Sequence, residues 1–263
     1  MVFLLLSDRA YLSPSCHKMM QELYHRKDDL SMATEVYLAM RSEEFDAFEH
    51  PSAKPGWLDC HFSSEGPGLS GLPHVLPPGS LLVLTDQLSF RDHDPDLITE
   101  QLHQTVTTLD CAGILLDFEK MEQEELPALA NILVSSLPCP VAVSELYARE
   151  IDCPVFISPC PHHVPLSEHI APWAGRKIWL DLARNAEVIE ITSSGTIVSP
   201  DPREDIQCDE HWDKNLHCHY HIEITGNSVR FMLRRAKEDM IALLQEAKKL
   251  GIQNCIGLYQ EWK

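Results

Sequence analysis

The segment CAGILLDFEK (residues 111–120) decides the fold, because it joins an apolar strand to two carboxylates. Asp117 lies inside the apolar run and Glu119 follows it two residues later. Side chains of a strand alternate between its two faces, so Gly113, Leu115, Asp117 and Glu119 all point the same way. This pattern is typical of a strand that crosses a protein core and presents acidic groups at its carboxyl end.

Similar short apolar runs recur along the 263-residue chain. They are VFLLLS (2–7), TEVYLAM (34–40), SLLVLTD (80–86), GILLDFE (113–119), CPVAVSE (139–145), CPVFISP (153–159), KIWLDLA (177–183) and NCIGLYQ (254–260). Helical spacing of apolar residues appears between them, at 95–110, 122–137 and 228–251. Eight strands that alternate with helices predict an α/β fold, a (β/α)8 TIM barrel.

Two regions depart from this alternation. Residues 49–79 are rich in Pro and Gly and are predicted to form a long loop beside the second strand, with a short helix or strand inside it. Residues 185–227 contain strand-like stretches separated by turn signals. We therefore expect a single barrel domain over 1–263, with a small antiparallel β-hairpin region at 185–227 inserted after strand 7.

Charge and cysteine usage limit the classes of partner and the compartment. The chain has 40 acidic and 21 basic residues, a formal net charge of −19, which repels phosphate backbones and anionic membranes. We therefore expect neither nucleic acid nor membrane as a partner. The apolar start is too short for a signal-peptide core and lacks a basic leader, and the nine cysteines form no CxxC pair. These features predict a cytoplasmic protein with reduced thiols.

The two carboxylates of the opening segment predict acid chemistry. In (β/α)8 barrels the active site lies at the carboxyl ends of the strands. Carboxylates two residues apart on a strand are about 6–7 Å apart, and their repulsion and partial burial raise the pKa of one of them. A carboxyl that stays protonated at neutral pH is the proton donor that glycosidic bond cleavage needs. The competing interpretation is structural: Asp117 pairs with a barrel Arg or Lys, or Glu119 begins the next helix.

The stretch AGILLDFE (112–119) also resembles a known signature, the strand-4 pattern Asp-Gly-x-Asp-x-Asp-x-Glu of family 18 glycoside hydrolases, the chitinase-like barrels. Gly113, Asp117 and Glu119 match in order, and Phe118 falls in the aromatic position. The resemblance implies a barrel that acts on N-acetylated sugar chains. Glu119 would be the general acid, and Asp117 would orient the N-acetyl group that serves as the nucleophile. The insertion after strand 7 and Trp262 at the end of strand 8 also resemble the family, in which a terminal-strand Trp floors the sugar site.

The departures from the family pattern leave alternatives open. Ala112 and Leu115 stand where the pattern has its first two Asp residues, and no segment clearly matches the family's Met-x-Tyr-Asp. A catalytically degenerate barrel that binds carbohydrate or a protein partner is therefore the first alternative to an enzyme. A metal-dependent hydrolase that uses His162, His163 and the histidines of 217–221 is the second.

Polar residues at other strand ends are predicted to line the mouth of the barrel and contact a carbohydrate ligand. They are Asp86, Gln87, Glu145, Asp181, Gln260 and Trp262. We expect no bound metal at this mouth, and no cofactor, because no glycine-rich phosphate-binding motif precedes a helix of the required kind.

Overall fold

The computed structural model describes residues 34–50, 52–88, 90, 93–120, 125–200 and 211–262. The apolar run at 2–7, predicted as the first strand, lies outside the described residues. Within the described part of the chain, no helix is long and apolar enough to cross a bilayer.

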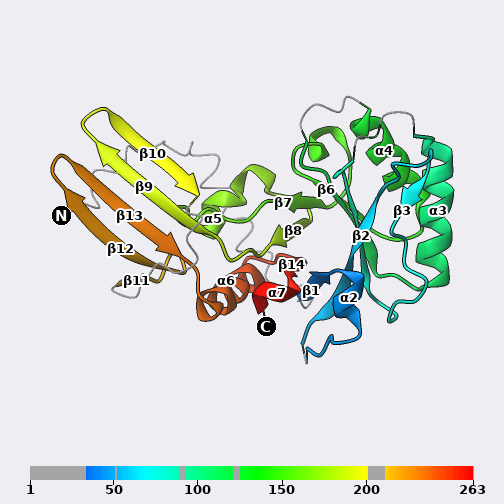
Figure 1. Cartoon of the computed structure of the whole chain (residues 1–263), viewed down its shortest axis with the longest axis horizontal. Coiled ribbons are helices and arrows are strands. Elements are labelled where there is room, and N and C mark those ends of the chain that lie inside the picture. Colours follow the sequence, from blue (N-terminus) through cyan, green and yellow to red (C-terminus); the bar gives the residue numbers. More distant parts are fainter. Residues whose placement is uncertain are drawn as a thin grey trace. The chain divides into compact units, whose positions relative to one another are not determined.

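Eight parallel strands close into a barrel (Figure 1), which confirms the predicted (β/α)8 fold. In chain order they are β1 (Glu35–Met40), β2 (Lys54–Phe62), β4 (Leu81–Thr85), β5 (Gly113–Asp117), β6 (Val141–Ser144), β7 (Val155–Ile157), β8 (Ile178–Asp181) and β14 (Asn254–Leu258). Each strand pairs with the next, and β1 closes the barrel by pairing with both β14 and β2. A short strand, β3 (Leu69–Ser70), adds antiparallel to β2.

Alternation along the strands divides the core into two layers. Leu82 and Leu84 of β4 belong to the layer between strands and helices, whereas Leu81 and Val83 belong to the barrel interior. The interior cluster consists of Tyr37, Ala39, Leu81, Val83, Leu115, Ala142, Phe156, Trp179 and Ile256. Strands buried on both faces are near-continuous apolar runs, which explains why the sequence pattern found most of them.

The helices pack outside the strands. The long ones are α3 (Pro95–Thr108), α4 (Leu126–Ser136) and α6 (Lys237–Lys249), and the short ones are α2 (Ser42–Phe45), α5 (Leu166–His169) and α7 (Tyr259–Trp262). Short 3-10 turns occur at Ala148–Glu150 and Ala171–Trp173. Helix α3 begins where the Asp94 side chain accepts the backbone N–H groups of Asp96 and Leu97, followed by Pro95 in its first turn.

A five-stranded antiparallel sheet follows β8, which confirms the predicted insertion after strand 7. Its strands are β9 (Ala186–Thr192), β10 (Gly195–Pro200), β11 (His211–Asp213), β12 (Cys218–Thr225) and β13 (Ser228–Arg234), in the order β10-β9-β13-β12-β11. The sheet extends past residue 227, so the prediction of a helix from 228 onward is wrong there. Helix α6 begins only at Lys237.

The first two barrel strands also differ from the prediction. The run at 34–40 is the first barrel strand, and the second, β2, lies inside the region predicted as a long loop. Pro55 and Gly56 hid this strand from pattern reasoning. Glycine suits this position because a Cβ there would lie only 3.3 Å from the Cα of Ala39 on β1, which is a tight contact.

Candidate active site

Asp117 ends β5 and faces the interior of the barrel, because it is two residues beyond the interior residue Leu115. Thr85 of β4 lies in register with Asp117, and His61 of β2 lies in register with Thr85. Neighbours in register on parallel strands present their side chains on the same face. These three side chains therefore form a polar row at the carboxyl end of the barrel.

Thr85 is a residue that sequence reasoning missed. It is buried, and its hydroxyl makes no hydrogen bond with any residue that the structure describes. A buried hydroxyl of this kind is available to a ligand group at the mouth. His61 was missed because its strand was predicted as a loop.

The indole ring of Trp179 lies below this polar row in the barrel interior. Trp179 of β8 is 3% exposed, and its Cη2 atom lies 3.0 Å from the position that a Cβ on Gly113 would occupy. The ring therefore reaches across the barrel interior from β8 to β5, and Gly113 is required for this close approach. Trp179 is a core residue that closes the barrel beneath Asp117.

The loop after β5 is held by Asp86. This buried carboxylate accepts the backbone N–H groups of Glu119 at 3.1 Å and of Lys120 at 2.8 Å. The Lys120 ammonium donates to the carbonyl of Gln87 at 2.5 Å, and the Tyr147 hydroxyl donates to the carbonyl of Lys120. Asp86 thus fixes the backbone that carries Glu119, while the Glu119 side chain is exposed.

Burial and like charges act on the carboxyls of the interior. Burial raises the pKa of Asp117 from its ordinary value of 3.8 to about 7, and the charges of Glu119 and Asp86 add to the rise. Burial likewise raises the pKa of Asp181 to about 8, with further contributions from the charges of Asp117, Glu261 and Glu119. Asp117 is therefore the carboxyl of the opening segment whose pKa is raised.

The other predicted mouth residues take varied positions. Glu145 accepts the Ser158 hydroxyl at 2.5 Å and the Ser158 backbone N–H at 3.2 Å. Gln260 is exposed on α7 rather than in a strand. Its neighbour Glu261, which the sequence did not single out as a site residue, accepts the backbone N–H of Arg184 at 2.7 Å. Of the predicted set, the structure brings Asp181 into electrostatic contact with Asp117 and Glu119.

Trp262 lies at the end of α7, not at the end of the last strand as predicted. It is 6% exposed and belongs to the layer between strands and helices. Its Nε1 atom lies 2.5 Å from where a Cβ on Gly257 would be, so the ring packs on the outer face of β14. The buried ring offers little surface to a sugar, and the predicted contact stays a prediction.

Three of the histidines named for a metal site, His162, His163 and His219, take part in structural contacts. His217 precedes β12, so it does not share a strand face with His219. The His219 ring is 2.7 Å from a carboxylate oxygen of the buried Asp239. Glu187 of β9 accepts the backbone N–H of His162 and lies 2.9 Å from the His163 ring. No group of three His, Cys, Asp or Glu residues suited to a metal ion occurs in the described ranges.

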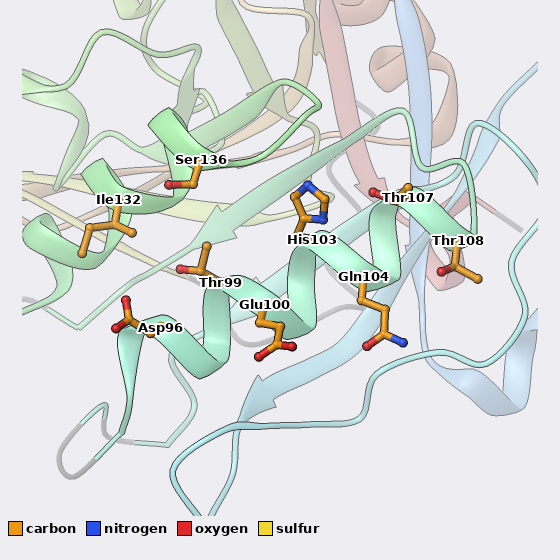
Figure 2. Close-up of a pocket in the computed structure, with 9 residues that line it drawn as sticks. All are labelled: Asp96, Thr99, Glu100, His103, Gln104, Thr107, Thr108, Ile132 and Ser136. Atoms are coloured by element: carbon orange, nitrogen blue, oxygen red, sulfur yellow. The ribbon is translucent and has the colours of Figure 1, made fainter.

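A separate polar groove lies on the outer helices, away from these carboxyls. Figure 2 shows side chains of α3 and α4 around it. Its lining residues are Asp96, Thr99, Glu100, His103, Gln104, Thr107, Thr108, Ile132 and Ser136. None of the interior-facing groups at the carboxyl end of the barrel contributes to this groove.

The raised pKa of Asp117 predicts a pH-dependent stability. The folded state keeps the Asp117 proton up to about pH 7, whereas the unfolded chain loses it near pH 3.8, so stability falls as pH rises between these values and is flat above them. Asp117→Asn removes this loss. We expect the difference in thermal midpoint, Asp117→Asn minus wild type, to become larger as the pH rises from 4 to 8. Circular dichroism measures both midpoints.

The exposed Asp152→Asn variant is the matched control, and its midpoint difference should stay constant across the same range. An Asp117→Asn difference that is also constant would show that Asp117 ionises normally in the folded protein.

The fold is a (β/α)8 barrel with carboxyls at the ends of its strands. No protein-family model matches the chain, and no curated protein sequence matches it. Solved structures do match, and they are family 18 chitinases and chitinase-like enzymes.

Three of these structures show the extent of the likeness. The chitinase from Chromobacterium violaceum ATCC 12472 has a TM-score of 0.56 and 9% identity, covering 88% of this chain and 96% of the other. The family 18 N-acetylglucosaminidase from Paenibacillus barengoltzii has a TM-score of 0.54 and 9% identity, covering 87% and 96%. The spore cortex-lytic enzyme SleL of Bacillus megaterium QM B1551 has a TM-score of 0.51 and 10% identity, covering 87% and 72%. At these identities the likeness concerns the fold.

Proposed function

We propose that this protein acts on N-acetylated sugar chains by acid catalysis, with Glu119 as the general acid and Asp117 as its partner. The observation that carries the proposal is the arrangement at the end of β5. An interior carboxyl with a pKa of about 7 is followed two residues later by an exposed carboxyl on a backbone that Asp86 holds in place. This arrangement places two carboxyls at the mouth, and the deeper one, Asp117, binds and releases a proton near neutrality.

The proposed reaction divides the work between the two carboxyls. Glu119 donates its proton to the leaving glycosidic oxygen as the bond to the anomeric carbon breaks. The oxygen of the substrate's own N-acetyl group forms the new bond to that carbon from the other face. Asp117, ionised, accepts the N–H of the same group and stabilises the positive charge that develops there. Water then opens the cyclic intermediate and returns the proton to Glu119.

Similar structures support a carbohydrate ligand. A plant class V chitinase mutant from Cycas revoluta, with a TM-score of 0.53 and 10% identity, was solved in complex with (GlcNAc)3. The chitinase of the same plant, with a TM-score of 0.52, was solved in complex with allosamidin. We extend the ligand class, N-acetylglucosamine oligomers, to this chain as part of the proposal. We also propose a cytoplasmic location, supported by the seven cysteines of the described residues, which are all free thiols.

One observation favours the non-catalytic alternative. Leu115, 1% exposed, fills the interior position where the family pattern has an Asp. A barrel that lost this carboxyl and its turnover would still bind a sugar at the same mouth.

The test is fluorophore release from aryl N-acetylglucosaminide and aryl chitobioside between pH 4 and pH 8. We expect release from the N-acetylated substrates and none from the matched aryl glucosaminide, which lacks the nucleophilic acetyl group. Calorimetry with chitotriose on the same preparation separates the alternatives. Binding without release would establish the non-catalytic protein, and neither binding nor release would overturn the proposal.

A further inference from the structure

An exposed tryptophan lies on an edge strand of the inserted sheet. Trp212 belongs to β11, the last strand in the order β10-β9-β13-β12-β11 (Figure 1). The residue is 51% exposed, although tryptophan is highly buried on average. Exposure of a single apolar side chain is ordinary by itself. What distinguishes Trp212 is the way in which its ring is held.

The polar atom of Trp212 is bonded inside the protein while much of its carbon ring faces water. The indole N–H donates to a carboxylate oxygen of Asp239 on α6 at 2.8 Å, and Asp239 is 2% exposed. An indole at a protein surface ordinarily lies the other way, with its ring on the protein and its N–H in water. The bond to Asp239 therefore fixes the ring in an orientation that leaves apolar surface uncovered.

Asp239 also holds a histidine next to this ring. Its second carboxylate oxygen accepts the backbone N–H of Ala236 at 2.8 Å and lies 2.7 Å from Nδ1 of His219 on β12. A carboxylate accepts the Nδ1–H group, so the Nε2 atom of the neutral imidazole is an acceptor. The His219 side chain is 28% exposed, so Nε2 is within reach of a ligand.

Trp212 and His219 lie side by side on one face of the sheet. They are directly opposite each other in the pairing of β11 with β12, and Arg234 of β13 is opposite His219 in turn. Residues that are opposite each other share a face, with Cβ atoms about 4.5–5.5 Å apart. The row therefore places hydrogen-bonding side chains on the strands next to an apolar ring.

We propose that Trp212 and His219 form a second binding site for N-acetylated sugar chains, on the inserted sheet. One sugar ring packs its apolar face on the exposed indole, and a hydroxyl or amide N–H at its rim donates to Nε2 of His219. A neutral sugar also avoids the repulsion that the net charge of −19 exerts on anions. The ligand class rests on the proposed function, whereas the residues of this site all come from the inserted sheet and α6, not from the barrel strands.

The experiment is an NMR titration of the full chain, labelled with 15N at its five tryptophans, with chitohexaose as the probe. The Trp212 indole signal is identified as the one that is missing in Trp212→Phe. In wild type we expect this signal to shift as chitohexaose is added, because a sugar ring on the indole changes the shielding of its N–H. A Trp212 signal that does not move would overturn the site, whatever the other four signals do.

Sedimentation with insoluble chitin measures what the two side chains contribute. Trp212→Ala should bind about tenfold more weakly, from loss of the packing surface. His219→Asn keeps an amide nitrogen in the place of Nδ1 but has no counterpart of Nε2, and it should bind about threefold more weakly. Ile224→Ala is the matched control, because Ile224 lies on β12 of the same sheet and is 77% exposed. Its binding should be unchanged.

Equal losses in Trp212→Ala and Ile224→Ala would overturn the site, since they would indicate unspecific adhesion of apolar side chains. Undiminished binding of His219→Asn would overturn the role of His219. Turnover does not enter these measurements. A Trp212 shift in a protein that releases no fluorophore would support the site and contradict the catalytic proposal, and release without the shift would do the reverse.

Discussion

Glu119→Gln should lower kcat on aryl chitobioside substrates by about 100-fold or more, which is the range for loss of a general acid. The amide keeps the size and exposure of the side chain and the backbone bonds to Asp86, but it has no proton to give to the leaving oxygen. Chitotriose affinity should stay within about threefold, because a general acid acts on the transition state more than on the bound sugar.

The leaving group gives this prediction a sharper form. Dinitrophenolate leaves a glycoside without being protonated. Glu119→Gln should therefore lose much less activity on a dinitrophenyl glycoside than on the matched substrate with a poor leaving group. Glu100→Gln is the control, since Glu100 is exposed on α3, in the polar groove away from the barrel mouth. Equal losses on both substrates, or a full kcat in Glu119→Gln, would place the acid elsewhere.

The sequence predicted the part of the site that one strand carries. Alternation alone puts Asp117 and Glu119 on the interior face of a buried strand, and the structure places Asp117 there. The raised pKa also follows from local features, because burial and the neighbouring carboxylate Glu119 are both visible in the segment 111–120. What the segment does not show is which carboxyl is buried and which is exposed, since that depends on where the strand ends.

The spacing of apolar residues along the sequence could not predict contacts between distant strands. The approach of Trp179 to Gly113 joins residues 66 positions apart, and no periodicity in either strand records it. The hydrogen bond from the Glu119 backbone to Asp86 joins residues 33 positions apart, so the sequence did not show that Asp86 holds this loop. His61 was not predicted as a site residue for a different reason: Pro55 and Gly56 gave its strand the sequence pattern of a loop. Tertiary packing at the Ala39 Cα, and not local preference, places a strand there.

The second large effect concerns the join between the barrel and the inserted sheet. Arg235, which directly follows β13, is 3% exposed and donates to four backbone carbonyls. Two of them, of Cys160 and Pro161, belong to the loop after β7. The other two, of Leu216 and His217, belong to the turn before β12.

Arg235→Met should lower the free energy of unfolding by about 3 kcal/mol or more, because methionine fills much of the space but removes the guanidinium donors from all four carbonyls. Urea unfolding followed by circular dichroism measures the loss. Arg230→Met, on the preceding strand β13, is the matched control: Arg230 is partly exposed and its ion pair with Glu223 is long, at 3.8 Å, so this change should cost no more than about 0.5 kcal/mol. Similar costs for the two variants would show that the guanidinium of Arg235 does not hold the loop and the sheet together. A large cost confined to Arg235 would identify one residue as the structural link between the loop that follows β7 and the insertion.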